Sequence, residues 1–131
     1  MEDVNEDIFS AIVLGKINDI KKGIDEIEAE IKERRDIDQK SLFDIQNEIL
    51  EVKNRILEVE QITGSKSNAS PIVEEMQKEI LTLDAEKRHE AVDLWRDLTA
   101  LRREIRLYMK ELNDLLRRAN IIKNERSRNS A

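Results

Sequence analysis

A heptad repeat of aliphatic residues constrains this chain more than any other feature. A first run steps by three and four residues through Ile17, Ile20, Ile24, Ile27 and Ile31. A second run with the same steps comprises Leu42, Ile45, Ile49, Val52, Ile56 and Val59, and a third comprises Leu94, Leu98, Leu101, Ile105, Tyr108, Leu112, Leu115, Ala119 and Ile122. Such spacing returns an apolar side chain to one helix face at every turn. It therefore predicts an all-α chain whose helices pack along narrow, coiled-coil-like seams.

The composition agrees with long, solvated helices. Of 131 residues, 40% are charged and only 3% are aromatic. A disordered chain can have this charge, but it lacks periodic aliphatic residues. Because few large rings are present, burial must come from the aliphatic seams between helices.

The helix boundaries can be read from a few local signals. Small polar residues from Thr63 to Ser70 predict one loop, with Gly64 suited to a helix end. Ser70 is a candidate N-cap, and Pro71, the one proline, suits the first helical position. We predict a single helical domain over residues 1–131, with a helix over about 5–62, a loop over 63–70, a helix over about 71–124 and a frayed tail over 125–131.

The first helix has one doubtful stretch, where its seam loses phase at residues 34–38. Eleven residues separate Ile31 from Leu42, which is three helical turns, so a stutter can carry the seam through. No Gly or Pro interrupts this stretch, and a continuous helix is favoured. The alternative is a break near residues 34–38, capped by Asp36 or Asp38, which makes a three-helix bundle.

A similar eleven-residue step occurs in the second helix, from Ile80 to Ala91, with Lys87 and Glu90 at the interrupted positions. In a hairpin centred near residue 67, these two steps do not face each other. The simple hairpin therefore leaves them offset.

The distribution of charge favours an antiparallel hairpin. Residues 1–31 contain nine acidic residues and three lysines, whereas residues 101–131 contain nine basic and four acidic residues. An antiparallel arrangement places these opposite charges side by side.

The open end of the hairpin has more apolar residues than a two-helix seam can bury. We therefore expect a homodimer that forms a four-helix bundle at that end. The alternative is that Phe9 and its neighbours fold back on their own hairpin.

Trp95 lies beside the seam residue Leu94, where its ring can cover the interface between two hairpins. We expect it to be buried in the bundle. The predicted interface comprises Phe9, Ile12, Val13, Leu14, Trp95, Leu107, Leu115, Leu116, Ile121 and Ile122.

Catalytic and metal sites have little support in the sequence. Glu86 and His89 have the Glu-x-x-His spacing of di-iron carboxylate bundles, but the motif occurs once and His89 is the sole histidine. Five acids resemble the Mg²⁺-binding clusters of all-helical nucleotide pyrophosphatases, although here they lie along one predicted helix: Glu74, Glu75, Glu79, Glu90 and Asp93. Cysteine and Gly-rich phosphate loops are absent. We expect no enzyme activity and no cofactor.

Nucleic acid and membrane are disfavoured as partners. The basic residues of the C-terminal end scatter around the helix among acids, so a solvated face explains them. The apolar run Ile8 to Leu14 is far shorter than the roughly 20 residues of a membrane span. A cytoplasmic location is the default expectation.

The function expected from these features is a non-catalytic structural or interaction module, such as a coiled-coil scaffold, spacer or adaptor, with an unidentified protein partner. The alternatives are a chaperone clamp, because paired helical arms resemble those of prefoldin-type chaperones, and weak nucleic-acid binding through the basic C-terminal end.

Overall fold

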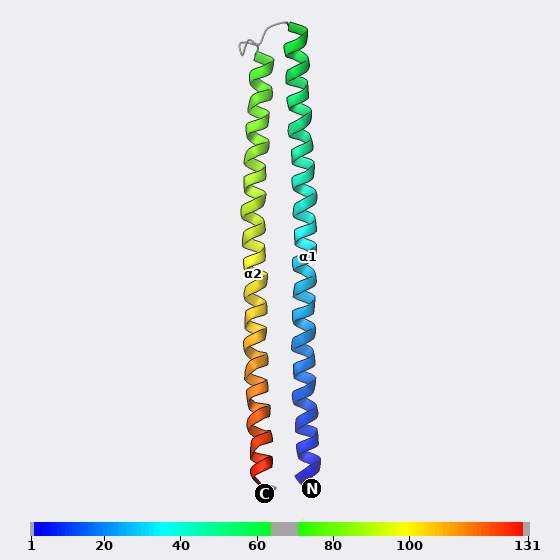
Figure 1. Ribbon diagram of the computed structural model, residues 1–131, viewed down its shortest axis with the longest axis vertical. Coiled ribbons are helices and arrows are strands. Elements are labelled where there is room, and N and C mark those ends of the chain that lie inside the picture. Colours follow the sequence, from blue (N-terminus) through cyan, green and yellow to red (C-terminus); the bar gives the residue numbers. More distant parts are fainter. Residues whose placement is uncertain (1, 64–70, 130–131) are drawn as a thin grey trace. The chain divides into compact units, whose positions relative to one another are not determined.

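The chain forms two long helices, α1 (Glu2–Thr63) and α2 (Pro71–Asn129), in a computed structural model. The structure describes the backbone of residues 2–63 and 71–129 and the side chains of residues 8–63, 71–121 and 123–125. Within those ranges every residue is helical and no strand occurs. The two helices run antiparallel and pack as a hairpin (Figure 1). The predicted all-α helical hairpin is confirmed.

The helix ends lie close to the predicted ones. α1 begins at Glu2, where a start near Asn5 was predicted. α2 ends at Asn129, a few residues beyond the predicted end near residue 124, in a stretch without Gly or Pro to stop it. Thr63, which was predicted to begin the loop, is instead the last residue of α1. The other residues of the predicted loop, 64–70, lie outside the described residues.

The chain divides into two compact units, and each helix contributes a segment to both. Unit 1 comprises Met1–Lys32 and Thr99–Ala131, and unit 2 comprises Glu33–Leu98.

Unit 1 is held together by an aliphatic seam. Ile17 and Ile20 of α1 pack with Leu112 of α2, and a ring of partly buried side chains surrounds them: Val13, Ile24, Tyr108 and Leu115. Gly23 lies beneath the Tyr108 ring, where a Cβ atom would stand 3.2 Å from the ring's Cζ. The small residue therefore lets the tyrosine pack at the seam position that the heptads predict for it.

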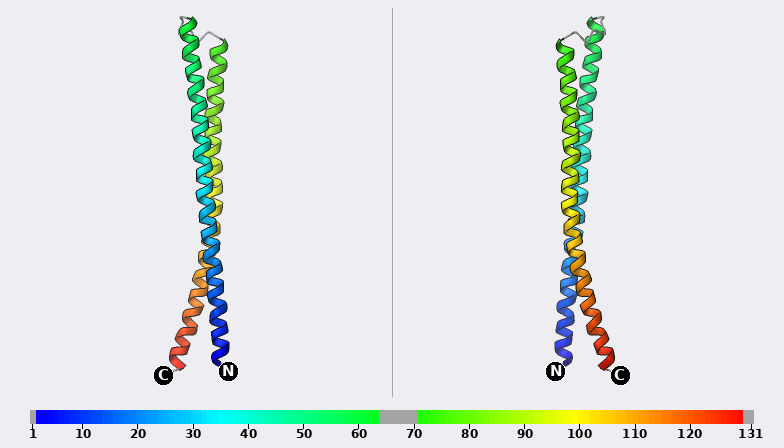
Figure 2. Two further views of the ribbon diagram at one scale, coloured as in Figure 1. Left: turned by 90° about the vertical axis from the view of Figure 1, so that its right-hand side faces the viewer. Right: turned by 90° about the vertical axis from the view of Figure 1, so that its left-hand side faces the viewer.

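Unit 2 has a second seam with the same construction. Ile49 and Val52 of α1 pack with Leu83 of α2, bordered by Ile45, Ile56, Met76 and Ile80. Val73, near the start of α2, is the most deeply buried of the described side chains, at 2% exposed. The two segments of this unit lie side by side in both views of Figure 2. Every residue of the first two predicted runs is buried or half-buried.

α1 is continuous through residues 34–38, so the alternative three-helix bundle is wrong. Arg34 is half-buried and Asp38 is buried, whereas Ile37 is 55% exposed. The seam therefore passes through two polar residues at the heptad positions, which explains why the apolar pattern loses phase while the helix does not.

The expected offset between the two eleven-residue steps is also corrected. Ala91 is exposed, and the α2 seam instead passes through Glu90, Leu94 and Leu98 in two steps of four. The α1 seam makes the same two steps from Arg34 through Asp38 to Leu42. Since Arg34 contacts both Glu90 and Asp97, the two irregular stretches face each other. An exposed alanine had been mistaken for a seam residue.

Candidate functional site

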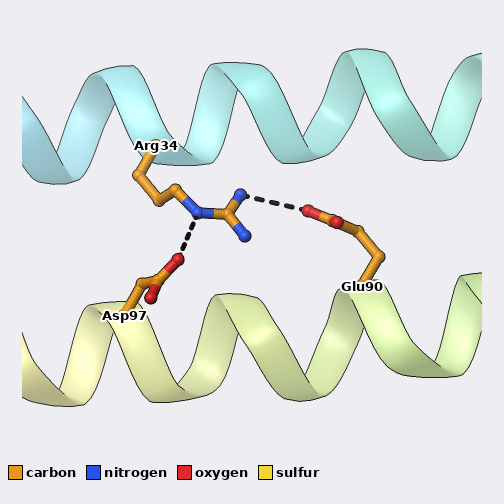
Figure 3. Close-up of polar contacts among 3 residues, drawn as sticks. All are labelled: Arg34, Glu90 and Asp97. Carbon is orange, nitrogen blue, oxygen red and sulfur yellow. Dashed lines mark hydrogen bonds and ion pairs between the residues drawn. The ribbon is translucent and has the colours of Figure 1, made fainter.

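A polar layer interrupts the aliphatic seam of unit 2. The Arg34 guanidinium donates from Nε to Oδ2 of Asp97 at 2.8 Å and from Nη1 to Oε1 of Glu90 at 3.1 Å (Figure 3). The side chains of Arg34 and Glu90 are 18% and 21% exposed, while that of Asp97 is 53% exposed. The hydrogen bond to Asp97, with a smaller contribution from Glu90, raises the pKa of Arg34 against the opposing effect of burial. One cation thus joins two acids that lie about two turns apart on α2.

Asp38 lies one turn further along α1 and is only 7% exposed. Its Oδ1 atom is buried without a hydrogen-bond partner. Burial and then the neighbouring Glu90 carboxylate raise the pKa of Asp38, and the charge of Arg34 opposes this shift only in part. The layer therefore places three acids around one arginine, with the least solvated acid driven toward its neutral form.

The exposed surface of unit 2 has two different faces. Each residue turns an α-helix by about 100°, so residues that directly follow seam residues form one flank and residues that directly precede them form the other. We call the first flank the apolar face, and it exposes five large apolar side chains: Phe43, Leu50, Leu57, Leu81 and Trp95. We call the second flank the acidic face, and it exposes ten acids: Glu33, Asp44, Glu48, Glu51, Glu58, Glu75, Glu79, Glu86, Asp93 and Asp97.

The two helices contribute to each face together. α1 and α2 point in opposite directions and turn their seams toward each other, so the flanks that follow the two seams lie on the same side. Trp95, which we expected to be buried in a bundle, is 70% exposed, so its own hairpin does not cover it. It belongs to the apolar face.

The predicted interface residues of the open end fall into two groups. Val13 and Leu115 pack against the core of unit 1. The others with described side chains are between 44% and 61% exposed: Phe9, Ile12, Leu14, Leu107, Leu116 and Ile121. The side chain of Ile122 lies outside the described residues. Phe9 and its exposed neighbours are not covered by their own hairpin.

The candidate metal ligands are not brought together. Glu86 and His89 are both exposed on α2, and Glu90 is bound by Arg34. The five acids compared with the pyrophosphatase clusters lie along α2, as the sequence predicted. Among the described residues, no three His, Asp or Glu side chains are grouped so that they could hold a metal ion.

Two open grooves lie along the described part of the basic C-terminal end. Arg102 and Arg106 line an open groove of about 470 Å³ with Thr99 and Ile105, all on neighbouring turns of α2. Glu104 and Glu111 line a second groove of about 380 Å³. Positive and negative side chains therefore alternate around the helix.

Comparisons with known protein families, with curated proteins and with solved structures find no match. Across the described parts of α1 and α2, no stretch is long and apolar enough to cross a membrane.

Sequence reasoning missed two features that the pattern contains. Arg34 and Asp38 continue the heptad steps after Ile31, so their burial could have been read from spacing alone. Phe43, Leu50 and Leu57 recur every seven residues, which is the signature of a second stripe beside the seam.

Proposed function

We propose that this protein is a non-catalytic interaction module that acts through helix–helix contacts and associates with a second copy of itself. A scaffold, spacer or adaptor role fits such a module. The cytoplasmic location expected from the sequence stays part of this proposal.

One observation carries the proposal. In the described part of the chain, nine hydrophobic residues are buried, whereas seventeen large hydrophobic side chains are exposed. A hairpin of two helices has no third layer to cover the remaining apolar surface. When this many exposed apolar side chains lie together on a surface, that surface is typical of one that binds another protein.

The open end offers the first test. Ile12 and Leu116 are 53% and 44% exposed, so an aspartate at either site costs their own hairpin little. Ile12→Asp and Leu116→Asp should each weaken the dimer, because burying an unpaired carboxylate in an interface is unfavourable. Sedimentation equilibrium measures the effect, with Asn18→Asp and Asn113→Asp as controls that add the same charge at exposed polar positions. If both apolar variants keep the wild-type dissociation constant, the open end is not part of the interface.

A chaperone clamp is the second candidate. It is favoured by the exposure of Ile8, Phe9 and Ile12 close to the start of α1, where a clamp would hold an unfolded chain. Such a protein should suppress the aggregation of a chemically denatured client, and Phe9→Ser should reduce that effect. Light scattering that is unchanged by the wild-type protein would exclude this role.

A further inference from the structure

The geometry points to the apolar face of unit 2 as a contact surface for a second copy of this chain, which covers it with its own apolar face. This inference rests on the proposed self-association and assigns it a location.

The spacing of the face identifies the partner as a pair of helices. Phe43, Leu50 and Leu57 of α1 are seven residues apart, and Leu81 and Trp95 of α2 are separated by two such intervals. A seven-residue repeat keeps side chains in line only with another long helix packed alongside. In α2 the position between Leu81 and Trp95 is Arg88, so this row has an apolar residue at each end and a basic residue in the middle. Because both helices of unit 2 contribute apolar side chains, the surface that matches the face is also two helices wide.

The size of the face fits an association between proteins. Its five large side chains are between 55% and 70% exposed. At on the order of 100 Å² each, they present roughly 500 Å² of apolar surface, before the flanking residues are counted. The largest apolar patch on a monomer is about 300–600 Å² and is often functional. A stable interface covers about 800 Å² on each partner, so the apolar side chains supply more than half of that area and the flanking residues supply the rest.

The charges of unit 2 favour a second copy in one orientation. Ten exposed acids lie on the acidic face, whereas the flank that presents the apolar side chains has three basic and three acidic residues: Arg35, Lys53, Arg88, Glu60, Glu74 and Asp84. Interface centres are enriched in aromatic residues, and the apolar face presents Phe43 and Trp95. Its basic and acidic residues balance, so two such faces can meet without net repulsion. When two copies meet through their apolar faces, a two-fold axis makes the contact self-complementary and both acidic faces point outward. For a chain of net charge −6, this arrangement keeps the carboxylates of the two copies apart.

The test combines two variants with the one tryptophan. Leu50→Asp and Leu81→Asp change residues that are 56% and 65% exposed in the hairpin, so each variant keeps its helix content. Sedimentation equilibrium should show each dissociation constant raised at least about tenfold. Ile62→Asp, at a residue that is 85% exposed on the opposite flank, is the matched control and should leave the dissociation constant unchanged.

The fluorescence of Trp95 gives an independent measurement. Its emission should shift to shorter wavelength as the wild-type protein is concentrated, because the second copy shields the ring from water.

Three results would overturn the inference. If the wild-type chain is a monomer at every concentration, both the inference and the proposed self-association fail. If it dimerises but Leu50→Asp and Leu81→Asp dimerise equally well, the dimer uses another surface and only this inference fails. A dimer without any shift in Trp95 emission leads to the same conclusion, and circular dichroism of each variant separates these results from unfolding.

Discussion

The two units use charge in opposite ways. In unit 1 the seam is aliphatic apart from Tyr108, and the charges lie outside it, acidic on the α1 segment and basic on the α2 segment. No ion pair joins the described side chains of this unit. In unit 2 the ion pairs lie within the seam, between Arg34 and two acids of α2. Charge outside a seam acts at long range and favours the antiparallel direction, whereas charge inside a seam can specify which turns meet.

The comparison shows why polar residues can occupy a seam position. Each helix takes two consecutive four-residue steps in unit 2, and these irregular stretches lie opposite each other. The long Arg34 side chain reaches from α1 to Glu90 and Asp97 of α2. An aliphatic layer at this position would be equally buried but would hold its partners less specifically. Unit 1 has no such layer among its described residues, and its seam is specified by shape, with Gly23 against Tyr108.

The largest expected effect tests the continuity of α1 through the polar layer. Ile37→Pro removes a backbone hydrogen bond and clashes with the preceding turn, which costs about 3 kcal/mol or more. The melting temperature should fall by on the order of 10 °C, as measured by circular dichroism. Because Ile37 is 55% exposed, Ile37→Ala is a clean control and should change little. Equal losses in the two variants would contradict a continuous helix.

Removal of the arginine tests whether the layer holds unit 2 together. Arg34→Ala leaves the half-buried Glu90 without its cation, and we expect a loss of about 1–2 kcal/mol in the free energy of unfolding. Urea denaturation measures it. Arg35→Ala, at the exposed neighbouring arginine, is the control and should have almost no effect. A loss of the same size in both variants would show that the polar layer contributes nothing specific.

The buried aspartate should make unit 2 sensitive to pH. Since the pKa of Asp38 is raised on folding, the folded chain binds this proton more tightly than the unfolded chain does. The resulting stabilisation is fully present below the ordinary value of 3.8 and is lost as the pH rises through the folded pKa.

Asp38→Asn removes the charge and should raise the melting temperature at pH 7 by a few degrees, or about 1 kcal/mol. This advantage over the wild type should shrink as the pH is lowered toward 3.8. Thermal melts across this range test it, with the exposed Asp36→Asn as the control. An advantage that is the same at every pH would mean that the charge of Asp38 is not its cause.

The smallest effect concerns the packing of unit 1. Gly15→Ala should stabilise α1 by about 0.5–1 kcal/mol through helix propensity, because nothing lies within 4 Å of the added Cβ atom. Gly23→Ala gains the same propensity but places its Cβ atom 3.2 Å from the Tyr108 ring, so its gain should be smaller. Thermal melts of both variants compare them. An equal gain would show that Tyr108 moves aside without cost.

Much of the fold could be predicted from the sequence because heptad spacing directly encodes which helix face is buried. The two helices and most buried residues of the seams follow from it, while the antiparallel direction follows from the distribution of charge. The buried Val73 and Leu83 precede the third predicted run and were missed. The polar layer was missed because a search for apolar residues passes over Arg34 and Asp38, although the heptad steps continue through both, and because Ala91 gave a false signal. Trp95 directly follows a seam residue, on the flank that its own hairpin leaves open, so its burial in a bundle of two hairpins stays a prediction.

The mass of the wild-type protein in solution tests the central claim, that a second copy covers the apolar surface left exposed by the hairpin. Sedimentation equilibrium over a wide range of concentrations measures this mass directly. The account predicts a mass that rises from 15.3 kDa for one chain toward twice that value as the concentration increases. A mass of 15.3 kDa at every concentration would contradict it.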